Sequence, residues 1–262
     1  MISIFSILSA VVLYSAVAVG FAQDSADYSL WPRRPAELEQ ARRLVAEQKL
    51  SEAVELLRPY VAERGIAGRE ARQITGAINV RRYLSRSHPG ANVHIVKRGE
   101  NLSRIAASTG CPSELIMLLN GLVEPSELKA GQKVVYVTMK LRMELRPLQR
   151  EITVWDGSTL VAAYNITAVE NIKNGVNEEV VVTIRDGYMN GAPIPRQSTQ
   201  FLASDREIGL SNGIKISSDA RGKDALLGMD AKDLNELSLL MAVGGRVSII
   251  WDEETFKPFS EG

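Results

Sequence analysis

Ser211 and Lys215 stand four residues apart in the run GLSNGIKISSD, residues 209–219. A serine hydroxyl attacks a carbonyl when a neighbouring base takes its proton, and lysine serves as that base in some enzymes. In an extended strand, however, this spacing places both side chains on one face but about 13 Å apart, too far for direct proton transfer. The favoured interpretation makes Ser211, Asn212 and Gly213 a turn and Lys215 a solvated strand residue.

The chain has one cysteine, Cys111, and two histidines, His88 and His94. Cys111 could act as a nucleophile with His94 near it, since a helix N-terminus lowers the pKa of a thiol. No substrate pocket is indicated around either residue, so Cys111 is interpreted as a small apolar residue at a helix start and His88 as a solvated side chain. A single cysteine excludes an internal disulfide and a cysteine-based zinc cluster. No metal or cofactor is predicted.

Acidic and basic side chains balance, with 31 Lys and Arg against 31 Asp and Glu. Such a chain has no net field that would attract nucleic acid, so nucleic-acid binding is disfavoured. Residues 2–22 carry no charged side chain and end in Gly20-Phe21-Ala22, which is typical of a signal peptide over residues 1–22. The alternative is an uncleaved membrane anchor. Both predict an extracytoplasmic location, in the periplasm or cell wall.

Residues 32–84 have the pattern of a helical arm. Apolar residues recur at helical spacing in three stretches, and Ser51 is a candidate N-cap of the second helix. The run AxxLVAEQKLSEAVELL, which starts at Ala41, resembles one tetratricopeptide-type hairpin. One such hairpin cannot bury its own apolar face and must pack on something else. A structural spacer is favoured over a partner-binding arm.

Residues 93–137 predict a strand, two helices and a second strand. β-branched runs at both ends are expected to pair, and Asn101 is placed to cap the first helix, which ends at Gly110. Asn120 and Gly121 are placed to end the second helix. The segment is therefore expected to fold as a small βααβ unit.

Several residues of this unit follow a known family pattern. Gly99-Glu100-Asn101-Leu102 replaces Gly-Asp-Thr-Leu, and Ile105-Ala106, Leu115, Asn120-Gly121-Leu122 and Gly131-Gln132 follow at the family's spacing. The unit thus resembles a lysin motif (LysM). The resemblance implies binding of N-acetylglucosamine-containing glycan, here peptidoglycan, in a shallow groove between the loop after the first strand and the loop before the second.

In such a groove, loop backbone groups would hydrogen-bond the acetamido groups of the glycan. Leu102 and Leu122 would cover sugar faces, whereas Ile105, Ile116 and Leu119 are interpreted as core. Single modules bind weakly, so a second contact elsewhere is expected to help. The implied glycan-binding residues are Gly99, Glu100, Asn101, Leu102, Asn120, Gly121, Leu122 and Val123.

Residues 139–252 predict a mainly β domain with one late helix. Trp155-Asp156-Gly157-Ser158 is typical of a hairpin turn, and Asp230 is placed to cap the helix. Residues 190–195 are expected to be loop. Strands are expected near residues 141–145, 152–154, 160–166, 180–184, 201–203, 214–216 and 247–251.

This order, with the runs REITVWDGSTLVAAYNIT and DAKDLNELSLLMAVGGRVSII, resembles the L,D-transpeptidase catalytic domain. In that family a loop before the late helix carries Ser-His-Gly-Cys-Ile-Arg-Met, and Ser211-Asn212-Gly213-Ile214-Lys215-Ile216 is similar to it without the cysteine. The family's chemistry needs a thiolate and a histidine, and neither residue type follows Cys111. The resemblance implies a degenerate catalytic loop at Ser211, Asn212 and Gly213. Lys215 would replace the family arginine and contact a stem-peptide carboxylate.

The sequence therefore predicts an α+β multidomain protein with a helical hairpin region, a βααβ LysM module and a mainly β, L,D-transpeptidase-like domain. Its predicted function is to bind peptidoglycan outside the cytoplasm as a pseudoenzyme without cofactors. One alternative is a peptidoglycan transpeptidase or carboxypeptidase with an atypical nucleophile. Another is an envelope scaffold that recruits a protein partner through the helical arm.

Overall fold

The structure is a computed structural model, which describes residues 35–88, 90–172, 175–189, 191–194, 200, 204–218 and 224–252. The predicted signal segment, residues 1–22, and the predicted strand at residues 201–203 lie outside these ranges. None of the helices in the described part of the chain combines the length and the apolar character needed to cross a membrane.

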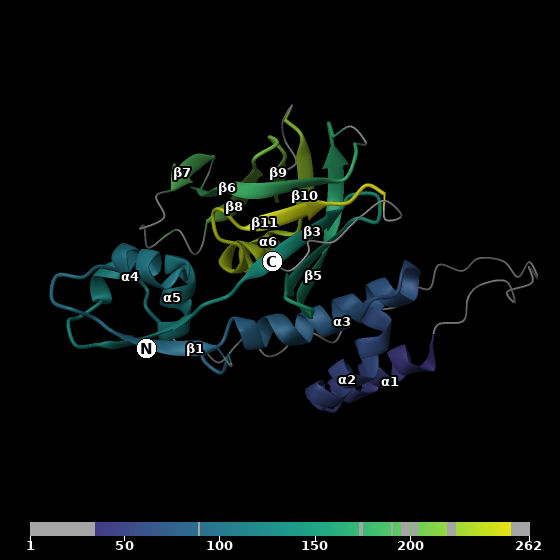
Figure 1. The fold of residues 1–262 in the computed structure, drawn as a ribbon, viewed down its shortest axis with the longest axis horizontal. Helices are drawn as coiled ribbons and strands as arrows, with labels where there is room; N and C mark the ends of the chain where they lie inside the picture. The colour runs from purple at the N-terminus through teal and green to yellow at the C-terminus, as the bar shows by residue number, and fades with distance from the viewer. Residues whose placement is uncertain are drawn as a thin grey trace, which may run out of the picture. The chain divides into compact units, whose positions relative to one another are not determined.

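Three helices form the N-terminal arm: α1 (Ala36–Ala46), α2 (Leu50–Val61) and α3 (Gly65–Tyr83) (Figure 1). Leu38, Leu57 and Ala71 belong to one small core shared by the three helices. The prediction of Ser51 as an N-cap is wrong, because α2 begins at Leu50 with Lys49 in the cap position and without a side-chain cap bond.

The βααβ order predicted for the next segment is confirmed. The elements are β1 (Ala91–Ile95), α4 (Leu102–Thr109), α5 (Ser113–Asn120), a 3-10 turn η2 (Pro125–Glu127) and β2 (Lys133–Val137). β1 and β2 form an antiparallel pair in which Val93 lies opposite Val135. The predicted caps are confirmed as well: Asn101 Oδ1 accepts a hydrogen bond from the backbone N–H of Arg104 at 2.9 Å, and Gly110 is left-handed at φ 68°.

The C-terminal part is one sheet with the strand order β11-β3-β4-β5-β10-β9-β8-β6-β7, and β11 also pairs with β6. This pairing closes eight strands into a barrel, and β7 extends it beside β6 (Figure 1). The strands are β3 (Leu141–Arg146), β4 (Glu151–Asp156), β5 (Thr159–Glu170), β6 (Glu178–Met189), β7 (Ala192–Ile194), β8 (Asp205–Leu210), β9 (Lys215–Ser217), β10 (Leu226–Met229) and β11 (Arg246–Ile249).

The barrel differs from the sequence-based expectation in several places, and two of its strands, β8 and β10, were not predicted. Ala192–Ile194, expected within a loop, is strand β7, and β6 continues through Asp186 and Gly187 instead of stopping before them. The turn at Gly157 and the helix α6 (Ala231–Leu240) are confirmed, with Asp230 Oδ1 capping α6 through the Lys232 amide at 2.9 Å.

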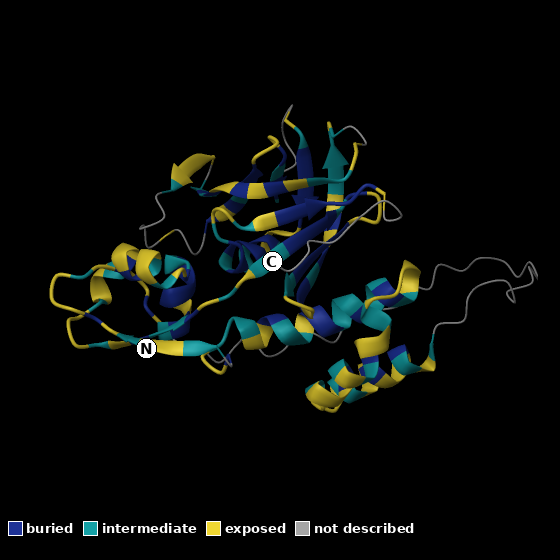
Figure 2. Cartoon of the chain, in the orientation of Figure 1, coloured by how far each residue is buried: buried dark blue, intermediate teal, exposed yellow. Residues whose placement is uncertain are grey.

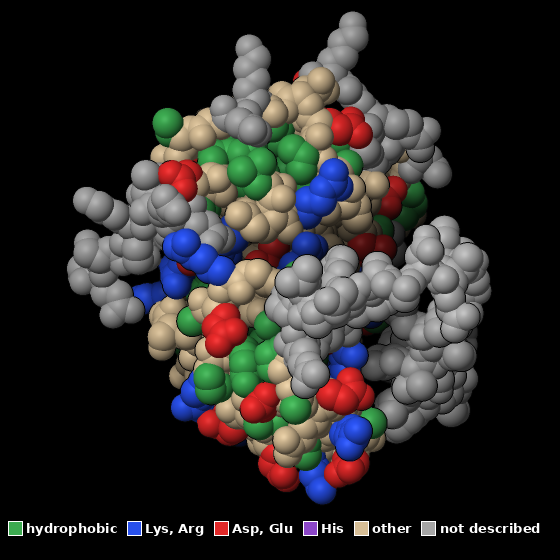
Figure 3. All heavy atoms as spheres, turned by 90° about the vertical axis from the view of Figure 1, so that its right-hand side faces the viewer, with side chains coloured by type: hydrophobic (Ala, Val, Ile, Leu, Met, Phe, Trp, Pro, Cys, Tyr) green, Lys and Arg blue, Asp and Glu red, His purple; other side chains and the backbone are tan. Residues whose placement is uncertain are grey.

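Apolar side chains that point inward at alternate positions of the strands fill the barrel interior. Met143 and Leu145 on β3, and Ile152 and Val154 on β4, are fully buried in one core with Leu234 of α6. Figure 2 shows this core as dark blue segments of the strands, with exposed residues gathered at turns and at the outer faces of the arm. On the face drawn in Figure 3, acidic and basic side chains are interspersed, in keeping with their equal totals.

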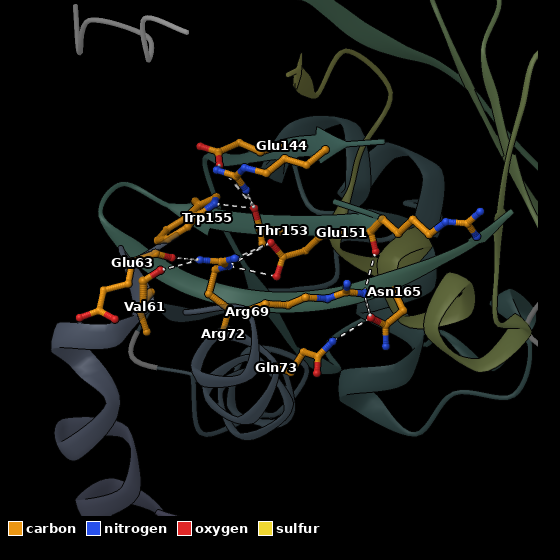
Figure 4. Close-up of polar contacts among 12 residues, drawn as sticks. Val61, Glu63, Arg69, Arg72, Gln73, Glu144, Glu151, Thr153, Trp155 and Asn165 are labelled. Carbon is orange, nitrogen blue, oxygen red and sulfur yellow. Dashed lines mark hydrogen bonds and ion pairs between the residues drawn. The ribbon is translucent and has the colours of Figure 1, made fainter. Parts of the chain in front are cut away.

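The arm docks on the barrel through α3 and β5. Gly76 of α3 faces the backbone of β5, where a Cβ atom would lie 2.4 Å from the nitrogen of Ala163. Beside this contact, Arg72 of α3 pairs with the fully buried Glu151 of β4, with Nη2 and Oε2 2.7 Å apart (Figure 4). The third helix therefore gives the hairpin the packing surface that it lacks alone.

Candidate functional site

Two loops flank the core of the βααβ unit, and each is anchored by a leucine. Leu102 begins α4 and Leu122 follows α5, and both lie in the same core with exposures of 3% and 8%. The prediction that their side chains cover sugar faces is therefore corrected, because a buried side chain has no surface to offer a ligand. Ile105, Ile116 and Leu119 are core residues as expected.

The first loop is shaped by Gly99 and Glu100. Gly99 has a φ of +74°, a conformation that favours glycine. The Glu100 carboxylate accepts hydrogen bonds from His94 Nε2 and from the backbone N–H of Lys97, each at 2.8 Å. These two bonds, the one from His94 first, lower the pKa of Glu100. The ionised Glu100 carboxylate thus holds the loop beside the exposed Asn101, while its own side chain is only 9% exposed.

The second loop is shaped by Asn120, Gly121 and Glu127. The side-chain amide of Asn120 bonds the backbone of Val135 in both directions, at 2.7 and 2.8 Å, so this group holds α5 to β2 instead of pointing at a ligand. Gly121 is left-handed at φ 64°, and Glu127 Oε2 accepts from the amide of Val123 at 2.7 Å. Glu127 was not among the predicted residues, and in the structure it forms a capping box with Glu124 at η2.

The two loops present polar backbone and one apolar side chain. Val123 is 65% exposed, and Gly99 and Gly121 leave their backbone groups without a covering side chain. Exposed peptide groups next to an apolar contact suit an N-acetylated sugar, whose acetamido group is polar and whose ring faces are apolar.

Comparison with known families identifies this unit. Residues 94–135 match the family model of the LysM domain. This segment is a LysM domain. LysM domains bind peptidoglycan or chitin-like glycans, so the match supports glycan binding by this segment. The comparison with curated proteins finds no match.

The loop at residues 211–213 belongs to the barrel, not to the LysM domain, and it forms the turn between β8 and β9. The amide of Gly213 donates to the carbonyl of Leu210 at 3.0 Å, and Gly213 has a φ of +86°. Ser211 Oγ accepts a hydrogen bond from the amide of Val181 at 3.2 Å, and Asn212 Nδ2 donates to Glu178 at 2.7 Å. These contacts agree with the interpretation of the run as a turn.

Lys215 lies on β9 between two carboxylates. Its amino group is 3.1 Å from Asp224 Oδ2 and 3.5 Å from Glu207 Oε1. The hydrogen bond to Asp224 and the charge of Glu207 raise the pKa of Lys215, which opposes a role as a base near neutral pH. The same two carboxylates compete with any incoming one, so the predicted contact with a stem-peptide carboxylate loses its basis.

The Cys111 thiol and the His88 ring are both buried in the fold. Cys111 is 1% exposed in the LysM core, and burial raises the pKa of its thiol to about 11. His88 is buried, in contrast to the solvated side chain expected, and its ring meets Tyr83 edge to face at 4.6 Å. Within the described ranges, no group of three His, Cys, Asp or Glu side chains could hold a metal ion.

Proposed function

We propose that this chain is a secreted cell-envelope protein that binds peptidoglycan through its LysM domain and that its barrel is not catalytic. The LysM match at residues 94–135 carries the proposal. The exposed loops around Gly99 and Val123 supply a surface of the kind that glycan binding needs. Secretion is supported by the uncharged segment at residues 2–22.

The non-catalytic assignment of residues 139–252 rests on chemistry and on contacts. Neither cysteine nor histidine occurs after Cys111, so the thiolate and the imidazole of the L,D-transpeptidase family have no counterpart. Ser211 and Lys215 are bound to different partners, the Val181 amide in one case and Asp224 with Glu207 in the other. The resemblance to that family remains a prediction from sequence.

Replacing Val123 with aspartate should weaken binding to purified peptidoglycan sacculi by about tenfold, because an apolar sugar contact is lost and a carboxylate takes its place. Co-sedimentation of the protein with sacculi over a range of sacculus concentrations measures this change. Val176→Asp is the matched control, since Val176 is 83% exposed and lies outside the LysM domain. Equal sedimentation of both variants with the unaltered protein would count against the groove.

Incubation with a carbapenem should add no mass to the protein, because no side chain of the proposed pseudoenzyme can attack the lactam carbonyl. Intact-mass spectrometry of the full chain measures the adduct, and an active L,D-transpeptidase treated in parallel shows that the reagent acylates. An adduct that maps to Ser211 would instead establish the alternative of an enzyme with an atypical nucleophile.

A further inference from the structure

A cavity of about 800 Å³ lies where the LysM domain meets the barrel. Gly110 and Pro112 line it from the turn between α4 and α5, and Lys140 and Arg142 line it from the connection into β3. The tip of the β4–β5 hairpin, at Ser158, and the turn between α6 and β11 complete the wall. Its size falls within the range of small-ligand sites in proteins.

The wall combines an apolar floor with an excess of positive charge. Lys140, Arg142 and Arg246 line the cavity against one carboxylate, that of Asp156, which accepts a hydrogen bond from the Tyr83 hydroxyl at 3.1 Å. Apolar side chains of the floor include Leu141 and Met241. A ligand that fits this wall is anionic and carries small apolar groups.

The basic side chains that line the cavity differ in whether they form ion pairs within the protein. Arg142 pairs with Glu144 and lies over the Trp155 ring, 5.3 Å from its centroid. Lys140 is exposed, and within the described part of the chain no carboxylate forms an ion pair with it. Arg142 is therefore held in place with its charge balanced by Glu144, whereas the Lys140 ammonium group is available to a ligand.

The cavity and the glycan loops lie at opposite ends of α4. Asn101 caps the N-terminal end of this helix beside the glycan loop, and Gly110 caps its C-terminal end in the cavity wall. A helix of this length spans about 12 Å. A peptide of four or five residues extends about 15 Å, so a peptide carried by a glycan in the groove can reach the cavity.

We propose that this cavity binds the acidic peptide that peptidoglycan carries on its glycan strand, with Lys140 contacting a peptide carboxylate. The proposal rests on the function proposed above, because it takes the glycan to be held by the LysM loops. Peptide and glycan then bind as two linked contacts, and the second is favoured by the high effective concentration that the first creates. The LysM domain and the barrel would together select peptide-bearing glycan.

The test compares two ligands that differ only in the peptide. Soluble glycan-strand fragments with intact peptides, and the same fragments after an amidase has removed the peptides, are titrated into the full chain by calorimetry. Intact fragments should bind about tenfold more tightly, which corresponds to one contact with a charged group. Lys140→Glu should remove this difference, and Lys232→Glu, the same change at an exposed lysine outside the cavity, should preserve it.

A second variant, Ser158→Phe, fills the cavity mouth from an exposed hairpin tip and should also remove the difference while stripped glycan still binds. Equal binding of intact and stripped fragments by the unaltered protein would overturn the peptide site and leave the glycan function standing. A preference for intact fragments that survives both Lys140→Glu and Ser158→Phe would overturn the site as well. Binding of free peptide without any binding of stripped glycan would support the cavity and refute the groove.

Discussion

Replacing Arg72 with alanine is expected to destabilise the protein by about 3–5 kcal/mol, because it leaves the carboxylate of Glu151 buried without its counter-ion. The Glu151 side chain is fully buried and that of Arg72 is 11% exposed. Arg72 Nε lies 3.0 Å from both carboxylate oxygens, and Nη1 donates to the carbonyls of Val61 and Glu63 at 3.1 and 2.8 Å (Figure 4). Urea unfolding of the full chain measures the loss.

Two further variants show whether the effect belongs to the buried pair. Arg58→Ala removes an arginine that pairs with Glu55 at the surface, where the side chain is 73% exposed, and it should cost less than about 1 kcal/mol. The double change Arg72→Met with Glu151→Leu should be more stable than Arg72→Ala alone, since no unpaired charge remains. A loss below about 1 kcal/mol in Arg72→Ala would show that the pair does not hold the arm to the barrel.

Local signals made the LysM domain predictable from sequence. Asn101 caps α4, and Gly110 and Gly121 end α4 and α5 in the left-handed conformation. The residues at these helix ends therefore predict where each helix begins or ends. The loops were placed correctly for the same reason. The inward direction of Leu102 was missed although Leu102 precedes the core residue Ile105 by three positions, which places both on one face of α4. Leu122 lies after the end of α5, where no helical spacing indicates the direction of its side chain.

Closure of the barrel depends on pairings between distant strands. β11 lies between β3 and β6, with Val247 opposite both Met143 and Val180, and no local pattern encodes that choice. β8 and β10 were not predicted, and each carries a glycine, Gly209 or Gly228, which weakens the strand signal.

The charged groups around individual side chains could not be predicted from the sequence either. Lys215 lies near Glu207 because β8 and β9 form a hairpin, and near Asp224 because β9 also pairs with β10. Glu114, in the first turn of α5, is buried at 3% exposure, with Oε1 3.8 Å from Nη2 of Arg185 on β6. This contact joins the LysM domain to the barrel.

Replacing Gly76 with alanine is expected to destabilise the protein by about 3 kcal/mol, at the upper end of the cost of overpacking. Alanine in place of glycine within a helix normally stabilises it by about 1 kcal/mol, so the sign of the effect is the test. The added Cβ would lie 2.4 Å from the nitrogen of Ala163 and 2.9 Å from the carbonyl carbon of Ala162. Both atoms are backbone of β5, which cannot rotate away as a side chain can, so α3 must move off the barrel.

The neighbouring position gives the matched comparison. Ala77 is exposed on the same helix, and Ala77→Gly should cost about 1 kcal/mol through helix propensity alone. Thermal or urea unfolding then ranks the stability of the unaltered protein, Gly76→Ala and Ala77→Gly. Gly76→Ala is expected to be the least stable although it has the best helix former at that position, because the contact between α3 and β5 outweighs the local preference. A Gly76→Ala protein as stable as the unaltered one would mean that α3 does not approach β5 this closely.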